Sequence, residues 1–199
     1  MNQPKPGDFI PVDDINQISF PQPKPMFQYL KKYNHIIVTG PQRSGTRIAA
    51  QMIAKDTDYT YIDEMDIYGS SIAMLIDKMH KNKHTVAQCP QLSNIAHMWP
   101  KDVFIIFMIR KIEDIINSQK RINWGLWEVM EKQNYRHTNL NMSLPIANIK
   151  YMYWYSHQKP ALVKQGHNNF LELEFETLKN HPMWIDKPQR TNFQWNETK

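Results

Sequence analysis

The chain has 199 residues, of which 41% are hydrophobic and 22% are charged, as is ordinary for a soluble globular protein of one domain. Its net charge of +5 suits an anionic ligand but is too small and too dispersed to indicate a nucleic-acid partner. The single cysteine cannot form an internal disulfide, and no cluster of cysteine and histidine is typical of a metal site. The sequence contains no apolar run of membrane-spanning length and no signal-peptide pattern. We therefore expect a cytoplasmic protein without a metal or a membrane contact.

The N-terminal region predicts an arm followed by a strand, a loop and a helix. Residues 1–26 contain six prolines and little periodicity, so we expect an extended arm before one domain at 27–199. The β-branched run at 36–38 predicts a buried strand over 35–39. A polar loop with Gly40 and Gly45 follows, and the apolar spacing after it predicts a helix over 45–55.

Further strands and helices alternate along the rest of the chain. The patterns predict strands at 58–64, 84–89, 103–109 and 169–175, and helices at 70–79, 112–122 and 144–155. A brief helix is expected at 91–98, and helical stretches without clear boundaries at 123–142. The run at 103–109 is apolar without alternation, which indicates a central parallel strand buried on both faces. We therefore expect a single-domain α/β fold of the P-loop type, a three-layer sandwich whose parallel sheet has four to five strands.

The loop at 40–47 is the first candidate binding site. Strand, glycine loop and helix aim free backbone N–H groups and the positive end of the helix at a phosphate. Gly40 and Gly45 have the spacing of a Walker A loop, but Thr46 and Arg47 stand where such a loop has lysine and a hydroxyl residue. Arg43 lies inside the loop, where its guanidinium can bind a phosphate or sulfate in bidentate fashion.

A second candidate site follows the central strand. Arg110 comes directly after this strand, and Ser118 lies about two turns into the next helix. Because ligands of open parallel sheets bind at the carboxyl ends of the strands, Arg110 and the loop face one crevice. We expect Arg110 and Ser118 to bind a phosphate group separate from that of the loop.

Both motifs resemble those of sulfotransferases. The segment 41–47, Pro-Gln-Arg-Ser-Gly-Thr-Arg, is similar to their 5′-phosphosulfate loop, and 104–118 is similar to their 3′-phosphate motif. Phe175-Glu-Thr-Leu also resembles a Tyr-Glu-Asp-Leu segment of that family. The resemblance implies a sulfotransferase-like fold and an enzyme that transfers a sulfuryl group from 3′-phosphoadenosine 5′-phosphosulfate (PAPS) to a hydroxyl or amine, leaving the bisphosphate PAP. On this resemblance the PAPS-binding residues are Arg43, Ser44, Gly45, Thr46, Arg47, Arg110 and Ser118.

The proposed transfer needs a base and a cation. Arg43 would stabilise charge on the leaving phosphate, and Glu64 would take the proton of the acceptor. Tyrosylprotein and heparan-type sulfotransferases use a glutamate at a comparable place, here within Asp63-Glu64. His97 is the alternative base, and Lys187 and Arg190 could replace a C-terminal phosphate-binding element of that family that this chain lacks.

Two other functions stay open at this stage. The chain could be a catalytically inactive PAP- or PAPS-binding module, or a P-loop kinase of nucleotides or small molecules. A kinase would need a Walker lysine, which the loop lacks, and ATP should then bind better than the bisphosphate. The acceptor, whether small molecule, carbohydrate or peptide, and the oligomeric state are not indicated by any pattern.

Overall fold

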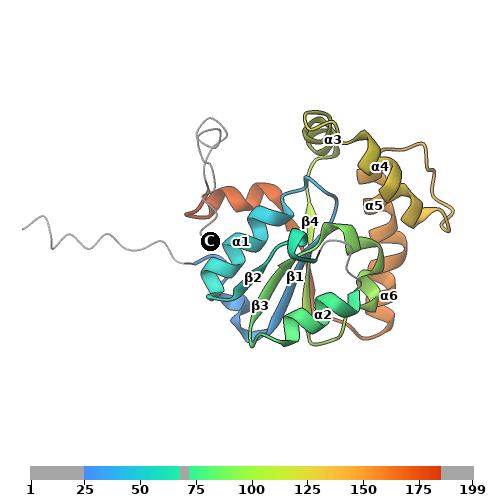
Figure 1. The fold of residues 1–199 in the computed structure, drawn as a ribbon. Helices are drawn as coiled ribbons and strands as arrows, with labels where there is room; N and C mark the ends of the chain where they lie inside the picture. The colour runs from blue at the N-terminus through green and yellow to red at the C-terminus, as the bar shows by residue number, and fades with distance from the viewer. Residues whose placement is uncertain (1–24, 68–71, 185–199) are drawn as a thin grey trace, which may run out of the picture.

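A five-stranded parallel sheet forms the centre of the protein in a computed structural model (Figure 1). The structure describes residues 25–67 and 72–184, so most of the expected N-terminal arm lies outside the described residues. The strand order is β2-β3-β1-β4-β5. The strands are β1 (His35–Thr39), β2 (Thr60–Ile62), β3 (Thr85–Gln88), β4 (Val103–Ile109) and β5 (Phe170–Glu174).

Helices cover both faces of this sheet. The α-helices are α1 (Thr46–Thr57), α2 (Ile72–His80), α3 (Ile112–Lys120), α4 (Gly125–Lys132), α5 (Ile146–Tyr153) and α6 (Lys159–Lys164). Short 3-10 segments are η2 (Gln28–Lys32), η3 (Glu64–Ile67), η4 (Pro90–Met98), η5 (Gln133–Tyr135) and η7 (Phe175–Asn180). A π-helical turn, η6 (Trp154–Gln158), joins α5 to α6. Within the described part of the chain, none of these helices has the length and apolar character needed to cross a membrane.

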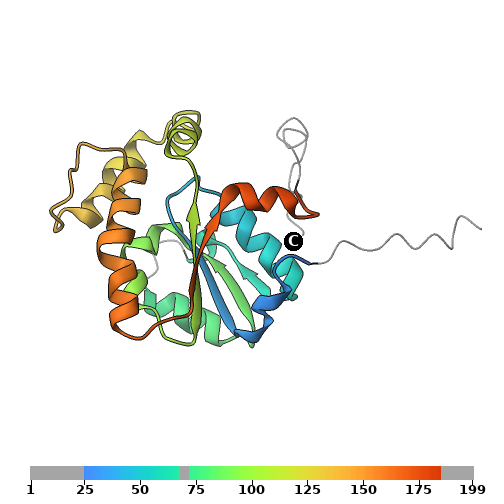
Figure 2. The ribbon, with the colours of Figure 1, turned by 180° about the vertical axis from the view of Figure 1, so that it is seen from behind.

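Alternating side chains of the strands build two cores, one on each face. On β1, Ile36 and Val38 pack against α1, η2 and η7, whereas Ile37 faces α2, η4, α5 and α6. On β4, Phe104, Ile106 and Met108 join the first core, and Ile105 and Phe107 join the second. Figures 1 and 2 show the result, with α1 and η7 on one side of the sheet and α5 and α6 on the other. This is the expected three-layer α/β fold of the P-loop type, with five strands.

The predicted strands are confirmed, and the largest differences lie in the helices. Strands β1 and β4 have the predicted bounds, and β4 lies inside the sheet between β1 and β5. The helix predicted at 144–155 continues through η6 into α6, and Pro160 stands in the first turn of α6. Strand β2 is shorter than predicted and ends before Asp63 and Glu64.

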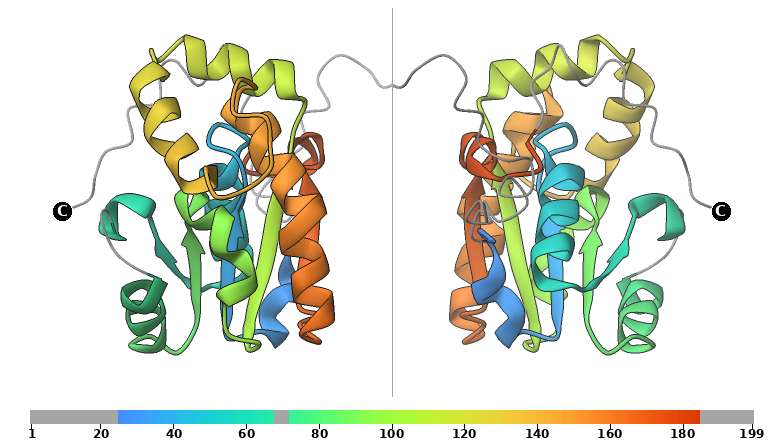
Figure 3. Two further views of the ribbon diagram at one scale, coloured as in Figure 1. Left: turned by 90° about the vertical axis from the view of Figure 1, so that its right-hand side faces the viewer. Right: turned by 90° about the vertical axis from the view of Figure 1, so that its left-hand side faces the viewer.

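The carboxyl ends of the strands meet at one edge of the sheet. The loop after β1, Cys89 after β3, Arg110 after β4 and Phe175 after β5 all lie there, because parallel pairing aligns the strand ends. Figure 3 shows the loop after β1 beneath α3 at this edge.

Candidate functional site

The glycines of the 40–46 loop are required by its backbone and its packing. Gly40 and Gly45 have φ of 129° and 101°, a region that residues with a side chain rarely adopt. A Cβ on Gly45 would lie 2.4 Å from Cδ2 of Phe175, and one on Gly40 would lie 3.1 Å from backbone atoms of Met108. Both glycines therefore let neighbouring segments approach the loop closely.

The loop presents hydrogen-bond donors at the start of α1. Gly45 is the N-cap of α1 and supplies no side chain to cap the first amides of the helix. Ser44 is fully buried, and its Oγ has no hydrogen-bond partner among the described residues. Unpaired amides with the positive end of a helix bind anions, so this loop can hold a phosphate.

Arg43 lies in the loop and is held from α3. Its Nε donates to Oγ of Ser118 at 3.0 Å, and its backbone is in the left-handed region with φ of 71°. Burial lowers the pKa of Arg43, and the neighbouring Arg121 and Arg47 lower it further. The terminal Nη groups make no ion pair within the described residues, which leaves them available for an anion.

Arg110 is also bound to the loop. Its Nη1 donates to the carbonyl oxygen of Arg43 at 2.9 Å, and its guanidinium lies 4.1 Å from the ring centroid of Phe175. The backbone of Arg110 is fixed by the Tyr151 hydroxyl, which accepts from its N–H and donates to its carbonyl. Burial lowers the pKa of Arg110. Arg110 and Ser118 thus both contact Arg43 of the loop, and their binding of a separate phosphate stays a prediction.

Arg47 is paired with the two carboxylates that follow β2. Its Nε lies 3.0 Å from Oδ2 of Asp63, and its Nη2 lies 3.7 Å from Oε1 of Glu64. Asp63 also accepts a 2.6 Å hydrogen bond from the Tyr61 hydroxyl. Although burial alone would raise the pKa of Asp63, these hydrogen bonds and the charge of Arg47 lower it overall. Arg47 and Asp63 form a fixed ion pair beside the loop.

Glu64 lies between this ion pair and the end of β3. Its backbone N–H faces Oε1 of Gln88, and the Gln88 amide donates to Oγ1 of Thr46 at 3.3 Å. Burial raises the pKa of the Glu64 carboxyl, which makes it a better proton acceptor. The structure therefore brings Glu64 near Thr46 and Arg47 at the start of α1.

The structure adds one cationic residue that the sequence patterns did not select. Lys150 of α5 is buried, and its Nζ contacts Oε1 of the loop residue Gln42 at 2.5 Å and the Pro90 carbonyl at 3.0 Å. The same Nζ lies 2.5 Å from Oε2 of Glu131 on α4. A signal was present, because Lys150 follows Ile146 and Ala147 at helical spacing and so falls on their buried face.

The other residues considered for the site, among them His97 and Cys89, do not contact the loop at 40–47 through any side-chain hydrogen bond described in the structure. A ring nitrogen of His97 lies 2.9 Å from Oε1 of Gln158, and its backbone N–H donates to the same oxygen. Burial raises the pKa of the Cys89 thiol to about 12, so it is not a reactive thiolate. Lys187 and Arg190 lie outside the described residues.

Comparison with known proteins points to kinases. No protein-family model matches the chain. Three relatives, the cytidylate kinases of Streptococcus pyogenes serotypes M6, M49 and M3, are each 22% identical over 173 residues, covering 72% of this chain and 75% of theirs. A shikimate kinase from Acinetobacter baumannii in complex with shikimate aligns with a TM-score of 0.42 and 11% identity, over 74% of this chain and 86% of that one.

These relatives overturn the sulfotransferase interpretation. The expected family, the PAPS donor with its product PAP, and sulfuryl transfer as the activity are wrong, because the relatives are kinases. The assignment of single residues is a separate matter. Arg110 and Ser118 both contact Arg43 in this structure, and their binding of a second phosphate stays a prediction.

Proposed function

We propose that this protein is a P-loop phosphotransferase that moves a phosphoryl group from a nucleoside triphosphate to a small-molecule acceptor. The observation that carries the proposal is the 40–46 loop, with its uncapped helix start, the buried Ser44 hydroxyl and the guanidinium of Arg43. The relation to cytidylate kinases supports the same reaction class and makes cytidylate (CMP) the first acceptor to assay.

Arginine takes the place of the missing Walker lysine in this proposal. The loop binds the terminal phosphates through backbone amides, and Arg43 neutralises charge on the transferred phosphoryl group and the leaving diphosphate. Arg110 positions Arg43 through the carbonyl contact and does not need to touch the nucleotide. The acceptor oxygen forms the new bond to phosphorus while the bond to the diphosphate oxygen breaks.

The residues of the loop do not fit a protein-held magnesium ion. Arg47 stands where a Walker A loop has its magnesium-binding hydroxyl, and Asp63 and Glu64 are paired with Arg47. Within residues 25–67 and 72–184, no group of three or more His, Cys, Asp and Glu side chains could hold a metal ion. The roles proposed here are therefore those of the chain's own residues.

The role of Glu64 depends on the acceptor. A hydroxyl acceptor must lose a proton, and Glu64, whose pKa is raised by burial, is the carboxylate that would take it. A phosphate acceptor presents an oxygen without a proton at neutral pH and needs no base. Glu64 is then a partner of Arg47 with no part in proton transfer.

The missing Walker lysine favours a second candidate, a nucleotide-binding module without catalysis. Thr46 and Arg47 replace the residues that reach the terminal phosphates and the magnesium ion in active P-loop enzymes. Both candidates predict nucleotide binding at the loop, and they differ only in turnover.

Nucleotide binding and turnover test the proposal together. We expect ATP to bind by isothermal titration, CMP to be converted to CDP with release of ADP, and Arg43→Ala to lower kcat/KM at least 100-fold, about 2.7 kcal/mol of transition-state stabilisation. Lys55→Ala, at the far end of α1, is the matched control and should behave as wild type. If adenosine 3′,5′-bisphosphate binds and ATP does not, the proposal fails.

Turnover then separates the two candidates and the two roles of Glu64. ATP binding without ADP formation, with CMP or with hydroxyl acceptors such as shikimate, selects the inactive module. In an active protein, Glu64→Gln should abolish transfer to a hydroxyl and should leave transfer to CMP nearly unchanged.

A further inference from the structure

The side chain of Lys150 is a buried cation that links α5 to the phosphate loop. Only 1% of this side chain is exposed, and among the described residues its Nζ has three oxygen partners. These are Oε1 of Gln42 at 2.5 Å, the Pro90 carbonyl at 3.0 Å and Oε2 of Glu131 at 2.5 Å. An ammonium group has three N–H donors, so the three oxygens satisfy all of them. Lys150 would therefore act on the site through these partners rather than as a ligand of the nucleotide.

Gln42 is the loop residue that Lys150 holds. It is buried, its side-chain oxygen accepts from Lys150, and its carbonyl oxygen accepts from Nε2 of Gln119 at 3.3 Å. The side chain of Gln42 is thus fixed from α5 and its backbone from α3.

The next residue, Arg43, has a backbone conformation that is unfavourable for a residue with a side chain. Its φ of 71° lies in the left-handed region, so neighbouring contacts must maintain it. After Arg43, the chain is held by Arg110, whose Nη1 donates to the Arg43 carbonyl. Before Arg43, it is held by the contacts of Gln42 with Lys150 and Gln119. Release of the Gln42 side chain would let the backbone relax and would move the Arg43 guanidinium.

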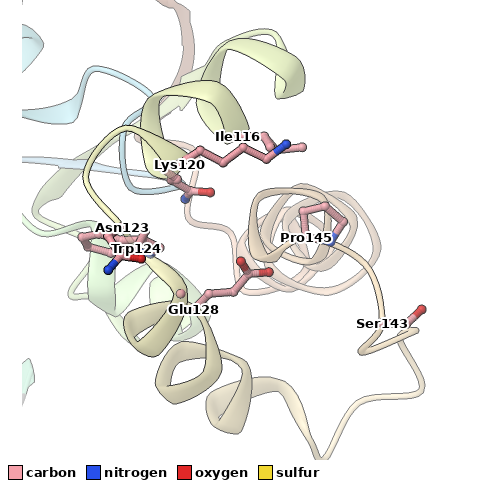
Figure 4. A pocket seen from close by; sticks show the side chains of 9 residues that line it. Ile116, Lys120, Asn123, Trp124, Glu128, Ser143 and Pro145 are labelled. Carbon is pink, nitrogen blue, oxygen red and sulfur yellow. The ribbon is translucent and has the colours of Figure 1, made fainter.

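The same ammonium group also fixes α4 to α5. Helix α4 buries no residue of its own, and its two carboxylates both bind α5. Glu131 is paired with Lys150, and Glu128 accepts from the Ile146 N–H at 3.2 Å. Figure 4, a view into the pocket between α3 and α4, shows Glu128 pointing toward Pro145 at the start of α5. Lys150 therefore lies where α4, α5 and the phosphate loop meet.

We propose that Lys150 is a positioning residue of the phosphate loop, which holds Gln42 so that the guanidinium of Arg43 faces the bound nucleotide. This role rests on the proposed phosphotransferase function for its ligand, and it adds a residue of α5 that lies outside the loop. Because Lys150 acts through Gln42 and Arg43, its removal should affect ATP binding while Arg43 is present and should have little effect once Arg43 is gone.

Two variants of the full chain release Gln42 in different ways. Lys150→Met/Glu131→Met removes the ammonium together with its carboxylate, so that no unpaired charge stays buried. Gln42→Met removes the accepting oxygen and keeps the pair of Lys150 and Glu131. Lys159→Met, which removes the ion pair of α6 with Glu172, is the control. Circular dichroism melting should show that each variant is folded.

The first measurement is ATP affinity by isothermal titration in a double-mutant cycle with Arg43→Ala. We expect each release variant to weaken ATP binding about tenfold, and to change it less than about twofold when residue 43 is already alanine. The control should bind ATP as wild type does. Equal losses in both backgrounds would mean that Lys150 acts independently of Arg43, and the positioning role would be wrong. Wild-type ATP affinity in Gln42→Met would also contradict it.

The second measurement needs no nucleotide, so it separates this role from the proposed function. Hydrogen exchange of the amides in 40–46, followed by mass spectrometry of the ligand-free protein, should be faster in both release variants and unchanged in Lys159→Met. Faster exchange in a protein that does not bind ATP would support the hold of Lys150 on the loop and overturn the phosphotransferase proposal. Wild-type exchange in both release variants would overturn the positioning role, whether or not ATP binds.

Discussion

The hydrogen-bond and ion-pair partners of Arg43 and Arg47 determine whether each arginine is available to bind an anion. Arg43 and Arg47 are four residues apart in one loop, yet Arg43 donates to a hydroxyl and Arg47 is paired with two carboxylates. Of these two, Arg43 keeps its terminal N–H groups free of carboxylate partners within the described residues. We therefore propose Arg43 as the arginine that contacts an anion, and Arg47 joins the start of α1 to the segment after β2.

The Arg47–Asp63 pair predicts a pH-dependent contribution to stability. The pKa of Asp63 is lowered in the folded state, so the carboxylate stabilises the fold above its unfolded pKa, and this contribution is lost as the pH falls through the folded value. We expect Asp63→Asn to lower the free energy of unfolding by about 1 kcal/mol at pH 7, a modest value because Arg47 is half exposed. Urea denaturation at pH 7 and pH 3 should show the difference from wild type shrinking at the lower pH. Asp77→Asn, in an exposed helical ion pair, is the control and should change stability by less than about 0.5 kcal/mol at either pH.

At the scale of elements, the strands could be predicted from sequence far better than the helices after residue 110. The seven consecutive apolar residues at 103–109 predict a strand that is buried on both faces, and β4 is such a strand. Helix α4 could not be bounded from its pattern, because it has no buried residue. Leu126, Val129 and Met130 face outward, while Glu128 and Glu131 face the molecule. Its position is set by the ion pair of Glu131 with Lys150 and by the hydrogen bond from the Ile146 N–H to Glu128, which no local periodicity encodes.

The same limit applies to the candidate site. Glycine spacing and the position after β1 located the loop, because backbone geometry demands those residues. The contacts of Lys150 with Gln42 and of Gln119 with the Gln42 carbonyl join residues more than 70 positions apart. Tertiary packing alone brings them together, so motif spacing could not indicate that Arg110 and Ser118 both contact Arg43.

Lys150 connects three elements, and its removal should show this directly. Lys150→Met would leave Glu131 buried without its partner, which should lower the free energy of unfolding by about 3 kcal/mol at pH 7. Because burial already raises the pKa of Glu131, the variant should recover stability as the pH falls and the carboxyl becomes neutral. The double variant Lys150→Met/Glu131→Met should be more stable than the single variant at pH 7. Chemical denaturation of the three proteins makes the comparison, and a double variant no more stable than the single one would contradict the pairing.

At the scale of the whole molecule, one edge of the sheet gathers segments from most of the chain. The loop after β1, the carboxylates after β2, Arg110 after β4 and Phe175 after β5 contact one another there. The three layers of the fold supply the rigid support, and α3 lies above the loop after β1 (Figure 3). A ligand bound at this edge would stabilise the entire fold, because unfolding destroys its site.

Thermal unfolding can therefore test nucleotide binding at the loop in one experiment. A ligand at 100 times its Kd adds about 2.7 kcal/mol, which corresponds to roughly 5–10 °C in Tm for a domain of this size. We expect ATP to raise Tm by this amount. Arg43→Ala should remove most of this shift, whereas the control Lys55→Ala, at the far end of α1, should keep it. If ATP raises the Tm of Arg43→Ala as much as that of wild type, the loop is not the nucleotide site.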